Sequence, residues 1–393
     1  MSVTSPSATP SPEGRTRLSL LVDEATRQLD ICNACRYCEG LCAVFPALSR
    51  RTVLSAGDVS QLANLCHDCR ACYDACMYTA PHEFDLNVPA VLTEVQLADY
   101  QRYVWPARVP GLLRGWTGLF TGAVASAALF VGIAAGHAGW PAIVAAHDGA
   151  ASPYRLIPDG VLVGLMLAAI AYSLLIGALA ARSYWAATGS RNVPVRPADV
   201  LRATWYALTL RYLRGGGVDC YYPDDDQPSP ARRYLHLLTV AGFGLCVAST
   251  AAAAVLQDIL GEQPPYAWLS APVISGTIGG ISLLAGGIGL LLLKARSSQV
   301  TSIAQMTMKD YGLLTALAFL ARSGLAVLLA RDTAAFGIIL LIHLAAVILP
   351  FASPLQQVRA RRVPVRCPRP RQRRAAPRRP AHIIKGRDNV GHA

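Results

Sequence analysis

Charged residues are scarce in this chain of 393 residues, of which Asp, Glu, Lys and Arg make up only 15%. Patterns that mark several classes of protein are missing as well. The sequence has no alternating strand pattern, no phosphate-loop spacing, no DNA-reading module and no concentration of carboxylates or other catalytic groups. These absences argue against a β-sheet protein, a nucleotide-binding enzyme and a protein that binds nucleic acid.

Cysteine, in contrast, follows a strict spacing. Eight of the eleven cysteines form two copies of the run C-x2-C-x2-C-x3-C, at Cys32, Cys35, Cys38, Cys42 and at Cys66, Cys69, Cys72, Cys76. Two-cluster bacterial ferredoxins use this run, and the fourth cysteine of each run ligates the other cluster. The predicted ligand sets of two 4Fe–4S clusters are therefore Cys32, Cys35, Cys38 with Cys76, and Cys66, Cys69, Cys72 with Cys42.

A disulfide framework and zinc sites are the alternatives. Disulfides need an oxidising compartment, and the first residues, MSVTSPSATPSPEG, do not form a signal peptide. Structural zinc is usually bound by paired C-x2-C motifs. Two four-cysteine runs with the same spacing fit that pattern poorly. His67 and His82 flank the second run. Each could hydrogen-bond a cluster sulfur or be an ordinary surface histidine.

The rest of the chain is rich in apolar residues, which make up 53% of the whole. Six stretches are long enough, or nearly so, to cross a hydrocarbon core, which takes about 20 apolar residues. They are Trp116–Gly136, Gly160–Ala181, Tyr234–Gln257, Pro272–Leu293, Tyr311–Ala330 and Ala334–Phe351. We expect an all-α protein with an N-terminal α-helical ferredoxin-like domain followed by a six-span transmembrane helical bundle. Further helices are expected over Ser49–Leu65 and Ala198–Leu213.

The distribution of Lys and Arg predicts the orientation. The 182–233 loop carries eight of these residues, whereas 137–159 carries only Arg155 and 258–271 carries none. The bias predicts a multi-pass protein of the inner (cytoplasmic) membrane, with its N-terminal cluster domain in the cytoplasm. That compartment is reducing, as thiolate-held clusters require.

Histidines inside the spans are candidate haem ligands, because ionisable groups in a membrane are costly and usually functional. We expect His236 and His343 to bind a cofactor, haem b, between facing helices; a helix-packing role is the alternative. His137, at the far end of the first span, is a third candidate. Arg322 could line a quinone or haem-propionate site, or snorkel to the surface.

Three stretches, ICNACRYCEGLCAVFPA, CHDCRACYDACMYTAPHEF and RYLRGGGVDCYYPDDDQPSPARRYLH, make the chain resemble the tricarballylate (citrate) utilisation B family over residues 28–350. The resemblance implies the same eight cysteine ligands and a membrane electron carrier. Its partner would be an FAD-dependent dehydrogenase that converts tricarballylate to cis-aconitate. Electrons would pass through two 4Fe–4S clusters and haem toward the quinone pool. Relatives tend to have paired histidines where this chain has Leu235 and His236.

The expected segments are a disordered lead-in at 1–27, the cluster domain at 28–110, the transmembrane domain at 111–352 and a basic disordered tail at 353–393. Residues 351–393 carry twelve Lys or Arg and one acid, Asp388, and so hold nearly all of the net charge of +12. Runs of Arg and Pro are also what GC-rich DNA yields out of frame. A reading-frame slip near Ala352–Leu355 is therefore a second hypothesis for the tail, which DNA sequencing tests.

An electron-transfer subunit accounts for these features better than a catalyst acting alone. Its partners would be the FAD-dependent dehydrogenase, the lipid bilayer and quinone. One alternative is a stand-alone quinone-linked iron–sulfur reductase with a substrate site near His67, His82 and Glu83. Another is the electron-transfer half of a cobalamin-synthesis flavoprotein system, because a related fused flavoprotein of cobalamin synthesis contains a part similar to this chain. A sensor or a transporter is a further option, although the spans resemble neither an obvious repeat nor a broken-helix transporter.

Overall fold

The structure is a computed structural model, and its description covers most of the chain up to Ala352. The described residues are 16–103, 116–146, 152–188, 196–209, 211, 220–221, 228–297, 300–301 and 303–352. The basic tail at 353–393, with the reading-frame hypothesis, lies outside them, as does most of the glycine-rich segment at 212–227.

Five helices form the N-terminal domain: α1 (Arg17–Cys35), α2 (Val44–Leu48), α3 (Ala56–Leu65), α4 (Ala71–Asp74) and α5 (Val88–Tyr103). Their apolar faces share one core, in which Leu29, Leu62 and Leu92 are fully buried. Helix α5 closes the domain by packing on both α1 and α3. The first cysteine run covers the end of α1 and the loop before α2, and the second surrounds α4.

The structure differs from three local predictions. Helix α1 begins at Arg17, inside the segment 1–27 predicted as a lead-in, because the Thr16 side chain caps it by accepting the Ser19 N–H at 3.3 Å. The helix predicted over Ser49–Leu65 begins only at Ala56, because Ser55 and Asp58 form a capping box there. The helix predicted over Ala198–Leu213 is α9 (Pro197–Leu208) and ends earlier.

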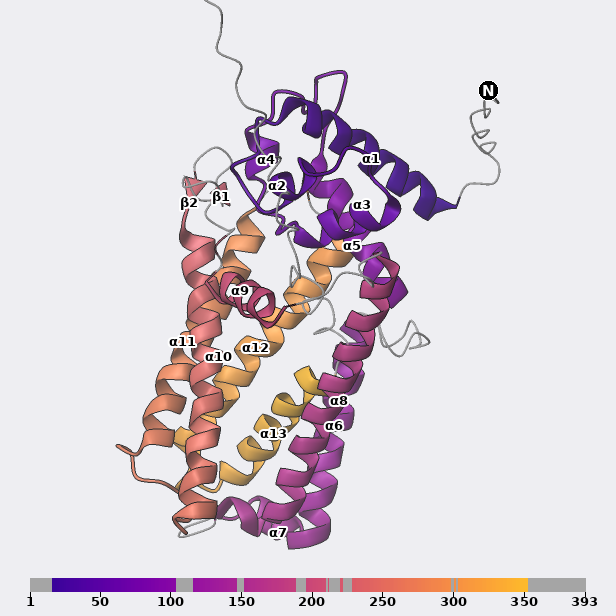
Figure 1. The fold of residues 1–393 in the computed structure, drawn as a ribbon. Helices are drawn as coiled ribbons and strands as arrows, with labels where there is room; N and C mark the ends of the chain where they lie inside the picture. The colour runs from indigo at the N-terminus through magenta and orange to yellow at the C-terminus, as the bar shows by residue number, and fades with distance from the viewer. Residues whose placement is uncertain are drawn as a thin grey trace, which may run out of the picture.

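The C-terminal part is a bundle of long helices that run up and down beside one another (Figure 1). They are α6 (Trp116–Ala138), α8 (Asp159–Ala187), α10 (Ala231–Ala254, continued by the π-helical turn η6, Val255–Ile259), α11 (Ala271–Arg296), α12 (Ala304–Ala330) and α13 (Phe336–Ala352). The short α7 (Trp140–Ile143) and the 3-10 turn η3 (Ser152–Arg155) follow α6. A two-residue pair of antiparallel strands, β1 (Cys220–Tyr221) with β2 (Pro228–Ser229), precedes α10.

Five helices in the described part of the chain are long and apolar enough to cross a membrane. They span Phe120–Ala138, Asp159–Ala187, Ala231–Ile259, Ala271–Arg296 and Met306–Ala330. The sixth predicted span corresponds to α13, a shorter apolar helix of 17 residues. At 1.5 Å per residue such a helix is about 25 Å long, which is less than the roughly 30 Å of a hydrocarbon core. In Figure 1 its last turn stops part-way along the bundle.

Glycines let α10 and α11 pack very closely. A Cβ on Gly242 would lie 2.5 Å from the backbone nitrogen of Leu283 and 2.8 Å from the carbonyl oxygen of Gly279. A Cβ on Gly286 would lie 2.8 Å from the carbonyl oxygen of Leu235. Backbone meets backbone along this pair, which is how small residues hold membrane helices together.

The N-terminal domain sits on one end of the bundle, over the ends of α8, α10 and α12 (Figure 1). The Tyr184 hydroxyl of α8 donates to the carbonyl of Ser60 at 3.2 Å, and the Asn87 side-chain amide donates to the carbonyl of Val300 at 3.0 Å. Lys309 of α12 stands 3.4 Å from the ring centroid of Tyr100. These contacts fix the cysteine runs at the end of the bundle.

Candidate functional site: two four-cysteine pockets

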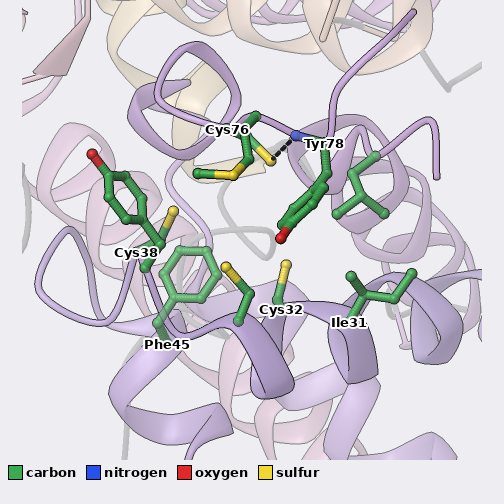
Figure 2. A pocket seen from close by; sticks show the side chains of 10 residues that line it. Ile31, Cys32, Cys38, Phe45, Cys76 and Tyr78 are labelled. Atoms are coloured by element: carbon green, nitrogen blue, oxygen red, sulfur yellow. Dashed lines mark hydrogen bonds between the residues drawn. The ribbon is translucent and has the colours of Figure 1, made fainter. Parts of the chain in front are cut away.

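One pocket of the N-terminal domain gathers cysteines from both runs. It is lined by Cys32, Cys35, Cys38 and Cys76, with Ile31, Tyr37, Phe45, Met77, Tyr78 and Leu86 around them. Figure 2 shows the sulfur atoms of Cys32, Cys38 and Cys76 turned toward the same space, with the rings of Phe45 and Tyr78 beside them. With its open mouth the pocket holds about 370 Å³ of empty space. We call it the outer pocket.

A second pocket gathers the other four cysteines. It is lined by Cys42, Cys66, Cys69 and Cys72, together with Leu41, Val44, Phe45, His67, Arg70, Ala71, Val88, Pro89 and Leu92. With its open mouth it also holds about 370 Å³ of empty space. We call it the inner pocket. The structure thus brings together the two sets of four cysteines that the spacing predicts, including the exchange of Cys42 and Cys76 between the runs.

The two runs have the same local backbone feature, which reasoning from the sequence missed. In each run an arginine follows the second cysteine, and both Arg36 (φ 56°) and Arg70 (φ 64°) adopt the left-handed conformation. Such a residue reverses the chain sharply. Helix α1 therefore stops at Cys35, and Cys38 returns toward Cys32. The signal was readable, because both runs contain C-x2-C-R-x-C.

Burial and the neighbouring sulfurs both oppose ionisation of the thiols. Burial, followed by the charges of Cys38, Cys76 and Cys35, raises the pKa of Cys32 to about 12. Burial, followed by the charge of Cys76, raises the pKa of Cys38 to about 11. In the inner pocket, burial also raises the pKa of Cys42 and of Cys72 well above its usual value. Four such sulfurs can become thiolates together only beside positive charge, as in an iron site.

Backbone amides point at several of these sulfurs. The Asp68 N–H donates to the Cys66 sulfur at 3.4 Å, and the Tyr78 N–H donates to the Cys76 sulfur at 3.4 Å. The amides of Val44 and Phe45 donate to Cys42 and favour its thiolate. Hydrogen bonds of this kind stabilise cluster sulfurs and raise the reduction potential.

The donor set fits an iron–sulfur cluster better than the alternatives. In the described part of the chain, no disulfide links any of the eight cysteines. Nor do the described residues contain a group of three or more His, Cys, Asp or Glu that could hold one metal ion. Two C-x2-C-x2-C-x3-C runs, each giving a set of four thiols, are the donor sets that 4Fe–4S clusters use.

The two pockets adjoin each other but face different surroundings. A gap between them is lined by cysteines of both sets, among them Cys38 and Cys72. At the outer pocket, Cys35 is exposed, and the residues Tyr37 and Met77 are 66% and 65% exposed. At the inner pocket, Cys69 is buried and packs with Ala71, Leu41 and the α10 residue Leu237. The outer pocket therefore faces solvent, and the inner pocket faces the bundle.

The structure does not gather the candidate haem ligands into one site. His343 is packed against α12, with its Nδ1 3.0 Å from the Ser323 hydroxyl and its Cε1 3.0 Å from where a Cβ on Gly324 would be. His236 lies near the start of α10, which packs along α11, whereas α13 packs on α12, α6 and α8. The two histidines thus stand on helices whose main packing partners differ. The binding of haem b by His236 and His343 stays a prediction.

The remaining candidates stand apart from one another. His67 lines the inner pocket. The Nδ1 of His82 accepts the Phe84 N–H at 3.1 Å, and its ring packs on Tyr78 and Phe84, so it serves the local fold. Glu83, His137 and Arg322 are exposed. Cys246 is half-buried in α10 beside Gly279. His67 and His82 thus have different surroundings, and the substrate site considered near them and Glu83 stays a prediction.

Comparison with known proteins gives a consistent match for both parts of the chain. The family model described as citrate utilization protein B Fer4-like domain matches residues 25–102, and the model for citrate utilization protein B matches residues 118–362. A relative from Escherichia coli named citrate utilization protein B is 39% identical over 333 residues, which cover 84% of this chain and 86% of that protein. No solved structure matches.

Proposed function

This chain belongs to the citrate utilization protein B family, and we propose that it carries electrons from a soluble flavoprotein into the membrane. The observation that carries the proposal is the pair of adjoining four-cysteine pockets on one end of an apolar helical bundle. The Fer4-like domain suggests iron–sulfur electron transfer in citrate utilization.

The eight cysteines would hold two 4Fe–4S clusters, with Cys32, Cys35, Cys38 and Cys76 in the outer pocket and Cys42, Cys66, Cys69 and Cys72 in the inner one. A cluster so held accepts and releases single electrons. The protein itself supplies the thiolates, the amide hydrogen bonds to Cys66 and Cys76, and apolar walls such as Phe45 and Leu86 that limit water. Exposure of Cys35 gives a soluble donor access to the outer pocket.

The donor in this proposal is a reduced FAD-dependent dehydrogenase of the tricarballylate type, and the acceptor is the quinone pool. Haem b as an intermediate carrier, with His236 and His343 as its candidate ligands, remains part of the proposal. The excess of Lys and Arg in 182–233 supports an inner-membrane protein with the cluster domain in the cytoplasm.

Quinone reduction in a bilayer tests the proposal. The protein is inserted in liposomes that contain ubiquinone, dithionite is added outside, and quinol is followed by its ultraviolet absorbance. We expect fast quinol formation with the native chain and only the protein-free background rate with Cys72→Ala. Equal rates for the two chains would overturn the relay, and so would turnover of tricarballylate by the native chain without a flavoprotein.

A further inference from the structure

Arg232, the second residue of α10, ties the bundle to the inner pocket. Its guanidinium makes two hydrogen bonds to the second cysteine run: Nη1 donates to the carbonyl of Asp68 at 2.7 Å, and Nη2 donates to the carbonyl of His67 at 2.9 Å. His67 and Asp68 are the two residues between Cys66 and Cys69. The planar fork of an arginine suits two adjacent carbonyls, whereas a lysine ammonium would not hold both in this way.

The loop that Arg232 holds is in an uncommon conformation. Asp68 has φ 50°, in the left-handed region, where a non-glycine residue is unfavourable unless its surroundings hold it. In this conformation the Asp68 N–H points at the Cys66 sulfur, 3.4 Å away. The two bonds from Arg232 therefore stabilise the backbone that directs an amide hydrogen at a sulfur.

A second contact from the same helix supports the first. Leu237 packs on Cys69 and Ala71, beyond the loop that Arg232 holds. Arg70 also lines the inner pocket, but its guanidinium pairs with Asp74 at 3.4 Å, which offsets its charge.

We propose that Arg232 is a positioning residue that raises the reduction potential of the inner-pocket cluster. This cluster would then be the one that passes electrons on toward the membrane. The inference rests on the proposed function, since it needs a cluster on Cys42, Cys66, Cys69 and Cys72. Arg232 acts in two ways. It adds positive charge near the site, and it fixes the amide hydrogen bond to Cys66; both favour the reduced cluster.

The test is a redox titration of the full chain in detergent, followed by electron paramagnetic resonance, with Arg232→Gln, Arg232→Lys and Arg233→Gln. Arg233 is the matched control: it carries the same charge one residue away, and its guanidinium lies over the ring of Tyr234, 4.9 Å from the centroid. A soluble dysprosium complex assigns the signals, because it relaxes the solvent-facing cluster more strongly.

The inner cluster is the one whose signal the dysprosium complex relaxes weakly. In Arg232→Gln we expect its ratio of reduced to oxidised form at a fixed potential to fall about tenfold. This corresponds to a fall of about 59 mV in the reduction potential of a one-electron couple. The outer cluster should not change. Arg232→Lys keeps the charge but not the fork, so its shift should be smaller, and Arg233→Gln should shift neither cluster. Loss of only the inner cluster in Arg232→Gln would also support positioning.

Unchanged potentials in Arg232→Gln, or equal shifts in Arg232→Gln and Arg233→Gln, would overturn the inference. A native chain without iron would instead refute the proposed function, so the two failures are distinguishable.

Discussion

Cys38 and Cys72 belong to different four-cysteine pockets, yet both line the gap that separates those pockets. Two clusters held this way would be near neighbours, with Phe45 among the side chains that line the gap. In the proposed function, this adjacency would let electrons move from the solvent-facing pocket to the one against the bundle.

Magnetic coupling is the first consequence. When both clusters are reduced, we expect spin–spin interaction to split or broaden the electron paramagnetic resonance signal. A chain with Cys66→Ala, which should hold only the outer cluster, should give a simple signal. A fully reduced native spectrum equal to the sum of two isolated signals would contradict the adjacency of the pockets.

The exchange of ligands between the runs gives a second prediction. Cys76→Ala should remove the same cluster as Cys35→Ala, because both sulfurs line the outer pocket. Cys42→Ala should instead resemble Cys69→Ala, because both line the inner pocket. Each variant should retain about half of the iron, and the dysprosium complex identifies which cluster is left. If Cys76→Ala matched Cys69→Ala, each run would hold its own cluster.

A buried carboxylate supports the cluster domain. Asp99 of α5 is buried and accepts hydrogen bonds from the Ser60 hydroxyl at 2.6 Å and the Asn64 amide at 2.7 Å. Asp99→Ala leaves both donors without this acceptor, which should cost about 1–3 kcal/mol of stability. The measurement is the temperature at which the cluster absorbance bleaches. Glu94→Ala, an exposed change on the same helix, is the control. Equal bleaching temperatures would remove Asp99 from this role.

The close pairing of α10 and α11 gives a matched pair of glycine variants. Gly242→Ala places a Cβ within 2.5 Å of the Leu283 backbone, so it should force the helices apart and lower the melting temperature in detergent. Gly244→Ala meets nothing within 4 Å. It should raise stability by up to about 1 kcal/mol, since alanine favours a helix interior over glycine. A Gly242→Ala protein as stable as Gly244→Ala would contradict this packing.

The two cysteine sets could be predicted because the signal is local. Spacing alone places three sulfurs on one turn, and the pairing of Cys76 with the first run follows from the known use of such runs. The start of α3 was also readable, since Ser55 and Asp58 form a capping box, but the apolar pattern was extended too far toward the N-terminus. The repeated arginine after the second cysteine was present in the sequence and was missed.

The sequence does not predict which pocket faces solvent and which faces the helical bundle. That depends on contacts between residues far apart in the chain, such as Arg232 with Asp68 and Leu237 with Cys69. The prediction for the histidines depends on contacts of the same kind. Whether His236 and His343 meet depends on how their helices pack, and glycines draw α10 onto α11 rather than onto α13.

The iron and acid-labile sulfide content of the anaerobically purified chain tests the central claim most directly. We expect about eight iron and eight sulfide per chain, which is what two 4Fe–4S clusters contain, with a brown colour that dithionite bleaches. A colourless chain that contains zinc, or no metal, under conditions in which a known two-cluster ferredoxin loads fully would contradict the account.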